Sequence, residues 1–206
     1  VLRRETNLAG MIMVHHETST GVLNPIDQLG LLARQYDVPF LVDAVSSLGG
    51  ETLAMDEWHI DVCVTSSNKC LGSFPGLAPV AVNRRVWDLL EQKETAVHGG
   101  WYLNLQTWRN SAKEWGNWHP TPVTVSSTAL EALYIGLCEL EAEGLEQRIA
   151  AFRETAASFR AGVKALGFGL FVEGEQASSV LTVITPPSGV DLEQLLSNLL
   201  QKHNIY

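Results

Sequence analysis

The chain has 206 residues, of which 46% are hydrophobic and 18% charged, and its 23 acidic and 14 basic side chains give a formal net charge of −9. A chain this apolar can bury a core, which excludes intrinsic disorder, and its acidic balance makes nucleic acid a poor partner. No apolar run reaches the length of a membrane span, so we expect no membrane partner.

The three cysteines, Cys63, Cys70 and Cys138, are widely spaced and form no CxxC pair. This pattern favours neither a zinc site nor a disulfide framework, and no metal is expected. Reduced thiols are typical of cytoplasmic proteins, and residues 1–10 lack the apolar core of a signal peptide, so we expect a cytoplasmic location.

The first half of the chain alternates short apolar strands with helices. We predict strands over residues 11–16, 39–42, 61–65 and 78–82, a helix through Leu29, Leu32, Ala33 and Tyr36, and a second helix from about Arg84. Asn24 is expected to cap the first helix, with Pro25 at its first position. Consecutive apolar residues are typical of parallel strands covered on both faces, so the pattern predicts an α/β fold with a largely parallel sheet.

Residues 94–122 show no clear period and contain four of the six tryptophans, namely Trp101, Trp108, Trp115 and Trp118. A long irregular stretch rich in aromatic residues is typical of a functional segment or a subunit interface. The alternative is a loop that packs on its own domain.

The remainder of the chain is predicted to form a small α+β unit reached through long helices. We predict helices over residues 125–142, 145–166 and 192–200, with Asp191 opening the last of them, and short strands over 168–172 and 180–184.

Polar groups follow three of the predicted strands, and in an open α/β sheet ligands bind at the carboxyl ends of the strands. They are the ETSTG loop of residues 17–21, Asp43, and the Ser66-Ser67-Asn68-Lys69 run. Lys69 lies among small and glycine-rich residues with no acidic neighbour in the sequence. A partly desolvated lysine of this kind has a lowered pKa and reacts with carbonyl groups.

Pyridoxal phosphate is the common cofactor that requires such a lysine. It also requires a carboxylate at its pyridine nitrogen, which Asp43 could supply. Its phosphate and phenolic oxygen require hydroxyl and amide donors, and Thr18, Ser19, Ser67 and Asn68 are of the right type.

Several sequence blocks, in this order and spacing, resemble those of the class V, fold-type I pyridoxal-phosphate aminotransferases. The blocks are residues 15–27 (HHETSTGVLNPID), 42–50 (VDAVSSLGG), 65–82 (TSSNKCLGSFPGLAPVAV), 101–110 (WYLNLQTWRN), 118–133 (WHPTPVTVSSTALEAL) and 141–154 (EAEGLEQRIAAFRE). The resemblance covers nearly the whole chain and is strongest to the alanine–glyoxylate and serine–glyoxylate group, with 2-aminoethylphosphonate–pyruvate transaminase near by.

The resemblance implies the PLP-dependent transferase fold of type I, with the mostly parallel sheet of a large domain and the start of a small α+β C-terminal domain. Residues 1–123 then correspond to the C-terminal part of the large cofactor-binding domain, 124–166 to connecting helices, and 167–206 to an incomplete small domain. The chain begins at Val1 and ends at Tyr206, and relative to this family we expect it to be a fragment at both ends.

The resemblance also implies roles for individual residues. Lys69 matches the Schiff-base lysine that moves the substrate proton, and Asp43 matches the partner of the pyridine nitrogen. Val45 matches the aliphatic residue under the cofactor ring, with plain core packing as the alternative. Thr18 matches a hydroxyl near the phenolic oxygen. Asn68 matches a phosphate ligand that is often Gln, with a turn cap as the alternative.

Two further positions imply a homodimer with shared active sites. Thr121 and Trp118 match residues that reach the phosphate of the other subunit, although Trp118 replaces the usual Tyr. His15 and His16 are interpreted as structural, because the lysine already performs the acid–base work, and Cys70 is given no role.

The implied activity is transamination between a small amino acid, such as alanine or serine, and a 2-oxo acid such as glyoxylate or pyruvate. The phosphate loop, the ring-stacking residue and the arginine for the substrate carboxylate are expected in segments outside these residues. Two alternatives stay open: a truncated, non-catalytic chain that only folds or dimerises, and a class V lyase or desulfurase. Asn68 argues against the desulfurase, which usually has His directly before the lysine.

Overall fold

The computed structural model describes residues 2–5, 8–91, 100–118 and 121–205. Its centre is a four-stranded sheet in the order β1-β4-β5-β6, in which β1, β4 and β5 are parallel and β6 is antiparallel to β5. The strands are β1 (Met11–Val14), β4 (Phe40–Asp43), β5 (Val62–Val64) and β6 (Val80–Val82). This confirms the predicted α/β fold with a largely parallel sheet.

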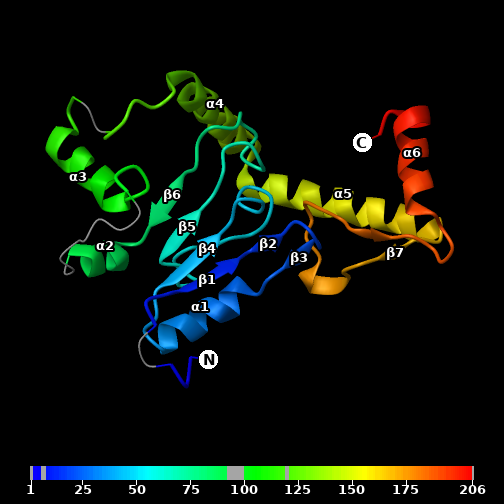
Figure 1. The fold of residues 1–206 in the computed structure, drawn as a ribbon, viewed down its shortest axis with the longest axis horizontal. Coiled ribbons are helices and arrows are strands. Elements are labelled where there is room, and N and C mark those ends of the chain that lie inside the picture. Colours follow the sequence, from blue (N-terminus) through cyan, green and yellow to red (C-terminus); the bar gives the residue numbers. More distant parts are fainter. Residues whose placement is uncertain (1, 6–7, 92–99, 119–120, 206) are drawn as a thin grey trace.

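Helix α1 (Ile26–Gln35) covers one face of the sheet (Figure 1). Its buried Ile26 and Ala33 pack with Phe40 and Val42 of β4 in the main core. The opposite face is less completely covered than the sequence predicted, because Ile12 of β1 is 72% exposed. The expectation of strands buried on both faces is therefore wrong for β1 within this chain.

The start of α1 differs from the prediction by one residue. Pro25 is the cap residue and its first helical residue is Ile26, so Asn24 does not cap the helix. The Asn24 side chain instead donates a hydrogen bond of 2.8 Å from Nδ2 to the carbonyl of Val14. Asn24 thus ties the entry of α1 to the end of β1.

The predicted first strand also ends earlier than expected. It stops at Val14, and β2 (His16–Glu17) pairs with β3 (Val22–Leu23) in a separate antiparallel hairpin. The polar ETSTG motif forms the end of β2 and the turn of this hairpin. Gly21, with φ +75°, closes the turn in a conformation that favours glycine.

The tryptophan-rich segment contains a helix that the sequence analysis missed. After α2 (Arg84–Glu91), which confirms the predicted helix, α3 (Leu105–Trp115) begins at Asn104, whose side chain accepts a hydrogen bond from the amide of Gln106. A polar helix with scattered aromatic residues gives no clear apolar period, which is why the prediction failed. Residues 92–99 and 119–120 of this segment lie outside the described residues.

The two long helices were predicted correctly. Helix α4 (Ser127–Glu143) ends at Gly144, with φ +89°, and α5 (Leu145–Ala165) follows directly. Together they lead from the sheet to the C-terminal elements (Figure 1). Of the predicted apolar face of α5, Ile149, Ala156 and Val163 are buried.

The C-terminal elements are short. They are β7 (Gly169–Leu170), the 3₁₀ turn η1 (Gly174–Gln176), β8 (Ile184–Thr185) and α6 (Leu192–His203). Strands β7 and β8 pair antiparallel, and most of the strand predicted over residues 180–184 lies outside this ladder. Asp191 caps α6 by accepting bonds from the amides of Glu193 and Gln194, as predicted. The division of the chain into domains remains a prediction.

No helix in the described part of the chain is both long and apolar enough to cross a membrane. The three cysteines are free thiols. Within the same residues, no three His, Cys, Asp or Glu side chains are grouped closely enough to hold a metal ion.

Candidate active site

Asp43 ends β4 at the carboxyl edge of the sheet, level with Val14 of β1 and Val64 of β5. Because these three strands are parallel, the chain leaves all of them at the same edge. Thr18 lies in the turn of the β2–β3 hairpin that follows β1, Asp43 at the edge itself, and Lys69 in the loop after β5. The structure therefore brings the three predicted segments to neighbouring positions on one edge of the sheet.

One oxygen of the Asp43 carboxyl group is occupied by the protein. Oδ1 accepts a 2.9 Å hydrogen bond from the amide of Val45, whereas Oδ2 accepts none from the residues that the structure describes. The pKa of the nearby Cys63 thiol is raised, first by burial of the thiol and then by the negative charge of Asp43. A carboxyl group with one oxygen fixed and the other available fits a ligand that presents an N–H group.

Val45 follows Asp43 in the same turn. Its side chain is half-buried and lies outside the cluster of side chains that packs in the core around Phe40. This placement favours an apolar contact for a ligand over the alternative of plain core packing.

Lys69 is exposed and, among the described residues, its side chain forms no ion pair or hydrogen bond. The expectation of a partly desolvated lysine is therefore wrong for this chain by itself. The loop around Lys69 is nevertheless fixed, because the buried Ser67 hydroxyl donates a 2.6 Å bond to the carbonyl of Phe74 and accepts one from the amide of Leu77. Ser67 is thus occupied within the loop and is not a candidate ligand.

Asn68 and Thr18 retain groups that could bind an anion or a phenolic oxygen. Asn68 is exposed, and its Oδ1 accepts a hydrogen bond from the Ser66 hydroxyl, which leaves the Nδ2 amide hydrogens available. The turn of the β2–β3 hairpin uses the Ser19 hydroxyl, which donates to Glu17 Oε1 at 2.7 Å, so Ser19 was wrongly included among the ligands. The exposed Thr18 hydroxyl forms no hydrogen bond with the described residues.

The Ser19 amide and hydroxyl together lower the pKa of the Glu17 carboxyl group, the amide having the larger effect. Glu17 therefore stays ionised as the acceptor that shapes the turn. This turn fixes the backbone on both sides of Thr18 without using its side chain.

His15 is enclosed in the fold, which agrees with the structural role predicted for it, whereas the same role for His16 stays a prediction. His15 Nδ1 is 3.0 Å from the Ser47 hydroxyl, its ring packs edge-on against Trp58, and the side chain is buried. Burial, with a smaller contribution from His16, lowers its pKa to about 4, against a small opposing effect of Asp27. A neutral, enclosed imidazole is a packing element and not an acid–base catalyst at neutral pH.

Cys70, next to Lys69, has a raised thiol pKa, caused first by burial and then by the nearby Glu51 carboxyl group. The thiol therefore stays protonated at neutral pH and is a poor nucleophile. Its placement agrees with the absence of a proposed role.

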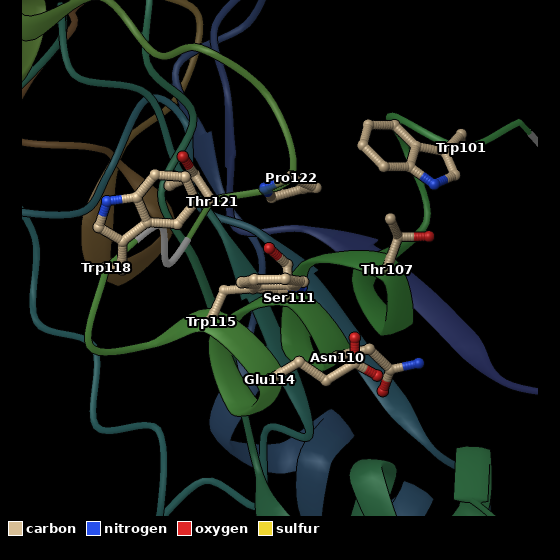
Figure 2. A pocket seen from close by; sticks show the side chains of 9 residues that line it. All are labelled: Trp101, Thr107, Asn110, Ser111, Glu114, Trp115, Trp118, Thr121 and Pro122. Atoms are coloured by element: carbon tan, nitrogen blue, oxygen red, sulfur yellow. The ribbon is translucent and has the colours of Figure 1, made fainter.

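Trp118 and Thr121 lie elsewhere, at an open cavity of about 510 Å³ beside α3 (Figure 2). Trp101, Trp115 and Glu114 also line this cavity, and the Trp115 and Trp118 rings are 6.2 Å apart. The Thr121 hydroxyl donates to the carbonyl of Val123. Lys69 and Asp43 do not line this cavity, so the described chain does not bring Trp118 and Thr121 to its own sheet edge.

Two polar residues that hold these loops were missed in the sequence, the buried Glu51 and the half-buried Arg148. The Glu51 side chain accepts a 2.9 Å hydrogen bond from the hydroxyl of Ser178, 127 residues away in the chain. Arg148 of α5 similarly donates to the carbonyl of Cys70. No local motif indicates such contacts, because each one joins segments that are far apart in the sequence.

The class V aminotransferase family model matches residues 2–206, so the chain belongs to the class V aminotransferases. An uncharacterized aminotransferase of Methanocaldococcus jannaschii is 35% identical over 100% of this chain and 52% of its own length. The pyridoxamine–pyruvate transaminase of Mesorhizobium japonicum is 33% identical, over 95% of this chain and 49% of its own. The chain thus spans about half the length of the curated relatives that it matches.

Solved structures agree with the fold. The alanine–glyoxylate aminotransferase of Nostoc sp. superposes with a TM-score of 0.87 at 31% identity, covering 96% of this chain and 51% of that one. The cysteine desulfurase of Thermococcus onnurineus, at 17% identity and a TM-score of 0.72, shares the fold alone.

Proposed function

We propose that the intact protein containing these 206 residues is a pyridoxal-phosphate-dependent aminotransferase, and that this chain carries the lysine side of its active site. The observation that supports this most strongly is the common sheet edge of Thr18, Asp43 and Lys69, each with a group that the described residues leave available. The family membership of the chain supports the same reaction class.

Pyridoxal phosphate supplies an aldehyde and an electron-accepting pyridine ring when it is bound. Asp43 Oδ2 would accept the pyridinium N–H and hold that ring in its protonated form. Lys69 would bind the aldehyde carbon through Nζ, and once released would hold the proton taken from the substrate α-carbon. Val45 would contact the ring, Thr18 the phenolic oxygen and Asn68 the phosphate.

The proposed substrates are a small amino acid, such as alanine or serine, and a 2-oxo acid, such as glyoxylate or pyruvate. Two similar proteins support these acceptors, since one is named a pyridoxamine–pyruvate transaminase and the other an alanine–glyoxylate aminotransferase. We propose a cytoplasmic enzyme, in line with its three free thiols.

We further propose a homodimer in which Thr121 and Trp118 serve the partner's site. Both residues line a cavity with exposed tryptophans that Lys69 and Asp43 do not line, which supports this arrangement. Two inactive variants, Lys69→Ala and Thr121→Val, should regain activity when they are unfolded and refolded together, because one mixed site in each heterodimer has both native residues. A complete lack of recovery would contradict shared sites.

The central test is covalent cofactor binding. The protein mixed with pyridoxal phosphate should develop a visible absorbance band, and after borohydride reduction mass spectrometry should find the pyridoxyl group on Lys69. Lys69→Ala should abolish both signals. Lys164→Ala is the matched control, because Lys164 is also exposed but lies on α5 in an ion pair with Glu173. An unchanged band in Lys69→Ala would refute the proposal.

The two alternatives differ in their products. A desulfurase or lyase would release sulfide or cleave the substrate, whereas an aminotransferase converts the oxo acid acceptor into an amino acid. A chain that only folds or dimerises would bind cofactor weakly and form neither product. Assaying the 206-residue chain beside the intact protein separates this last case from the first.

A further inference from the structure

Glu51 is a buried acidic side chain at the end of the turn that follows Asp43. It is 4% exposed, and its Oε1 accepts a 2.9 Å hydrogen bond from the hydroxyl of Ser178 and a second bond from the amide of Ser179. Ser178 is completely buried. The C-terminal segment of residues 177–181 is therefore anchored on the Asp43 turn by a buried carboxyl group.

The same segment also holds the hairpin turn that carries Thr18. The amide of Ser178 donates a 2.9 Å bond to the carbonyl of Gly21, and Ala177 forms an isolated antiparallel bridge with Val22. Residues 177 and 178 thus act as a short third strand beside the β2–β3 hairpin, close to where β2 and β3 meet the orange C-terminal chain (Figure 1).

The Lys69 loop meets the segment through Gly50. A Cβ atom added to Gly50 would lie 2.7 Å from Val180 Cγ2 and 2.8 Å from Cys70 Sγ. Contacts this close mean that the glycine is enclosed between the C-terminal segment and the residue next to Lys69. Cys70 is in addition held by Arg148, which donates to its carbonyl.

We infer that Glu51 and Ser178 are a positioning pair, which fixes the loops of Thr18, Asp43 and Lys69 relative to one another through the segment of residues 177–181. Its consequence for cofactor binding rests on the proposed function. One buried oxygen, Glu51 Oε1, receives both donors, so losing Ser178 Oγ leaves the carboxyl group under-satisfied in a buried place. Small displacements of reacting groups cost binding and rate steeply.

The first measurement is amide hydrogen exchange of the cofactor-free intact protein. Ser178→Ala should raise exchange roughly tenfold in all three loops, 17–21, 44–50 and 67–72, which corresponds to the loss of one buried hydrogen bond. Glu51→Gln should stay near wild type, because its amide oxygen still accepts both donors. Thr52→Ala is the control. Thr52 follows Glu51 directly, and the substitution removes only an exposed hydrogen bond that Arg153 of α5 donates to the Thr52 hydroxyl.

The second measurement is the affinity of the folded variants for pyridoxal phosphate. Ser178→Ala and Glu51→Ala should each weaken binding about tenfold, and the double variant should bind no more weakly than either single variant. Thr52→Ala should bind like wild type. A role in folding alone would change the free energy of unfolding and leave this affinity unchanged.

Exchange that increases only in residues 177–181, or equally everywhere, would refute the positioning role. If the three loops loosen in Ser178→Ala but the wild-type protein does not bind pyridoxal phosphate, the positioning pair stands and the proposed function fails. If the wild-type protein binds the cofactor and Ser178→Ala binds it equally well, the inferred consequence for the site is wrong while the function stands.

Discussion

The buried imidazole of His15 should make the stability of this fold depend on pH. In the folded chain its pKa is lowered from 6.5 to about 4, mainly because burial disfavours the charged ring. Below the unfolded pKa of 6.5, the unfolded chain takes up a proton at His15 that the folded chain does not. Stability from this group is therefore complete above pH 6.5 and is lost as the pH falls towards 4.

The magnitude follows from the two pKa values. One pKa unit corresponds to about 1.4 kcal/mol, so the loss reaches about 1.4 kcal/mol near pH 5.5 and about 2.5 kcal/mol near pH 4.5. Because other groups titrate over this range, the useful quantity is the difference in unfolding free energy between wild type and His15→Gln. The glutamine amide can both donate a hydrogen bond to the Ser47 hydroxyl and accept one from it, and it cannot ionise.

Urea unfolding of the cofactor-free protein at about pH 7.5, 5.5 and 4.5 measures this difference. We expect the advantage of wild type over His15→Gln to shrink by about 2.5 kcal/mol between the first and last condition. His59→Asn is the control: His59 is exposed, and Asn tolerates its φ of +52°. A constant difference, or one that grows in acid, would refute the burial argument.

Two further predictions concern the support of the sheet. Gly30→Ala should destabilise the fold by at least about 2 kcal/mol in urea unfolding, because the new Cβ would lie 1.7 Å from the carbonyl oxygen of Trp58 and would push α1 off the sheet. Asp61→Asn should cost about 3 kcal/mol, whereas Asp37→Asn should cost under about 0.5 kcal/mol, although both carboxyl groups pair with Arg85. The side chain of Asp61 is 7% exposed and that of Asp37 88%, so equal losses would contradict this reasoning.

The sheet and the polar residues at its carboxyl edge could be predicted from the sequence because both follow from local sequence patterns. Apolar runs mark each strand, and the polar residues directly after Val14, Val42 and Val64 mark where the strands end. Parallel pairing then brings those ends to one edge without any knowledge of side-chain contacts. The long helices α4 and α5 were equally predictable, since Gly144 separates two clear apolar patterns.

The wrong predictions have a different physical cause, because they depend on contacts that form only in the folded chain. Asn24, Ser19 and Ser67 have the residue types of a cap and of ligands, but each finds a closer acceptor within the fold. A side chain with several possible partners takes the one that the tertiary structure offers, and residue type cannot rank those partners. Helix α3 was missed because it has no apolar stripe; its contacts include Arg109, which lies over the Trp87 ring, 4.6 Å from the ring centre.

The exposure of Lys69 and the burial of Glu51 have to be considered together. Lys69, the lysine that we propose to be reactive, has a side chain with no ion-pair or hydrogen-bond partner among the described residues. Its loop is held by buried contacts to neighbours, through Cys70, Gly50 and the segment that Glu51 anchors. The proposed chemistry at this edge thus rests on residues close in sequence, while its geometry depends on a contact between two residues that lie 127 positions apart in the chain. A substitution at Ser178 should therefore change the position of the Lys69 loop, although Ser178 is not a hydrogen-bond or ion-pair partner of Lys69.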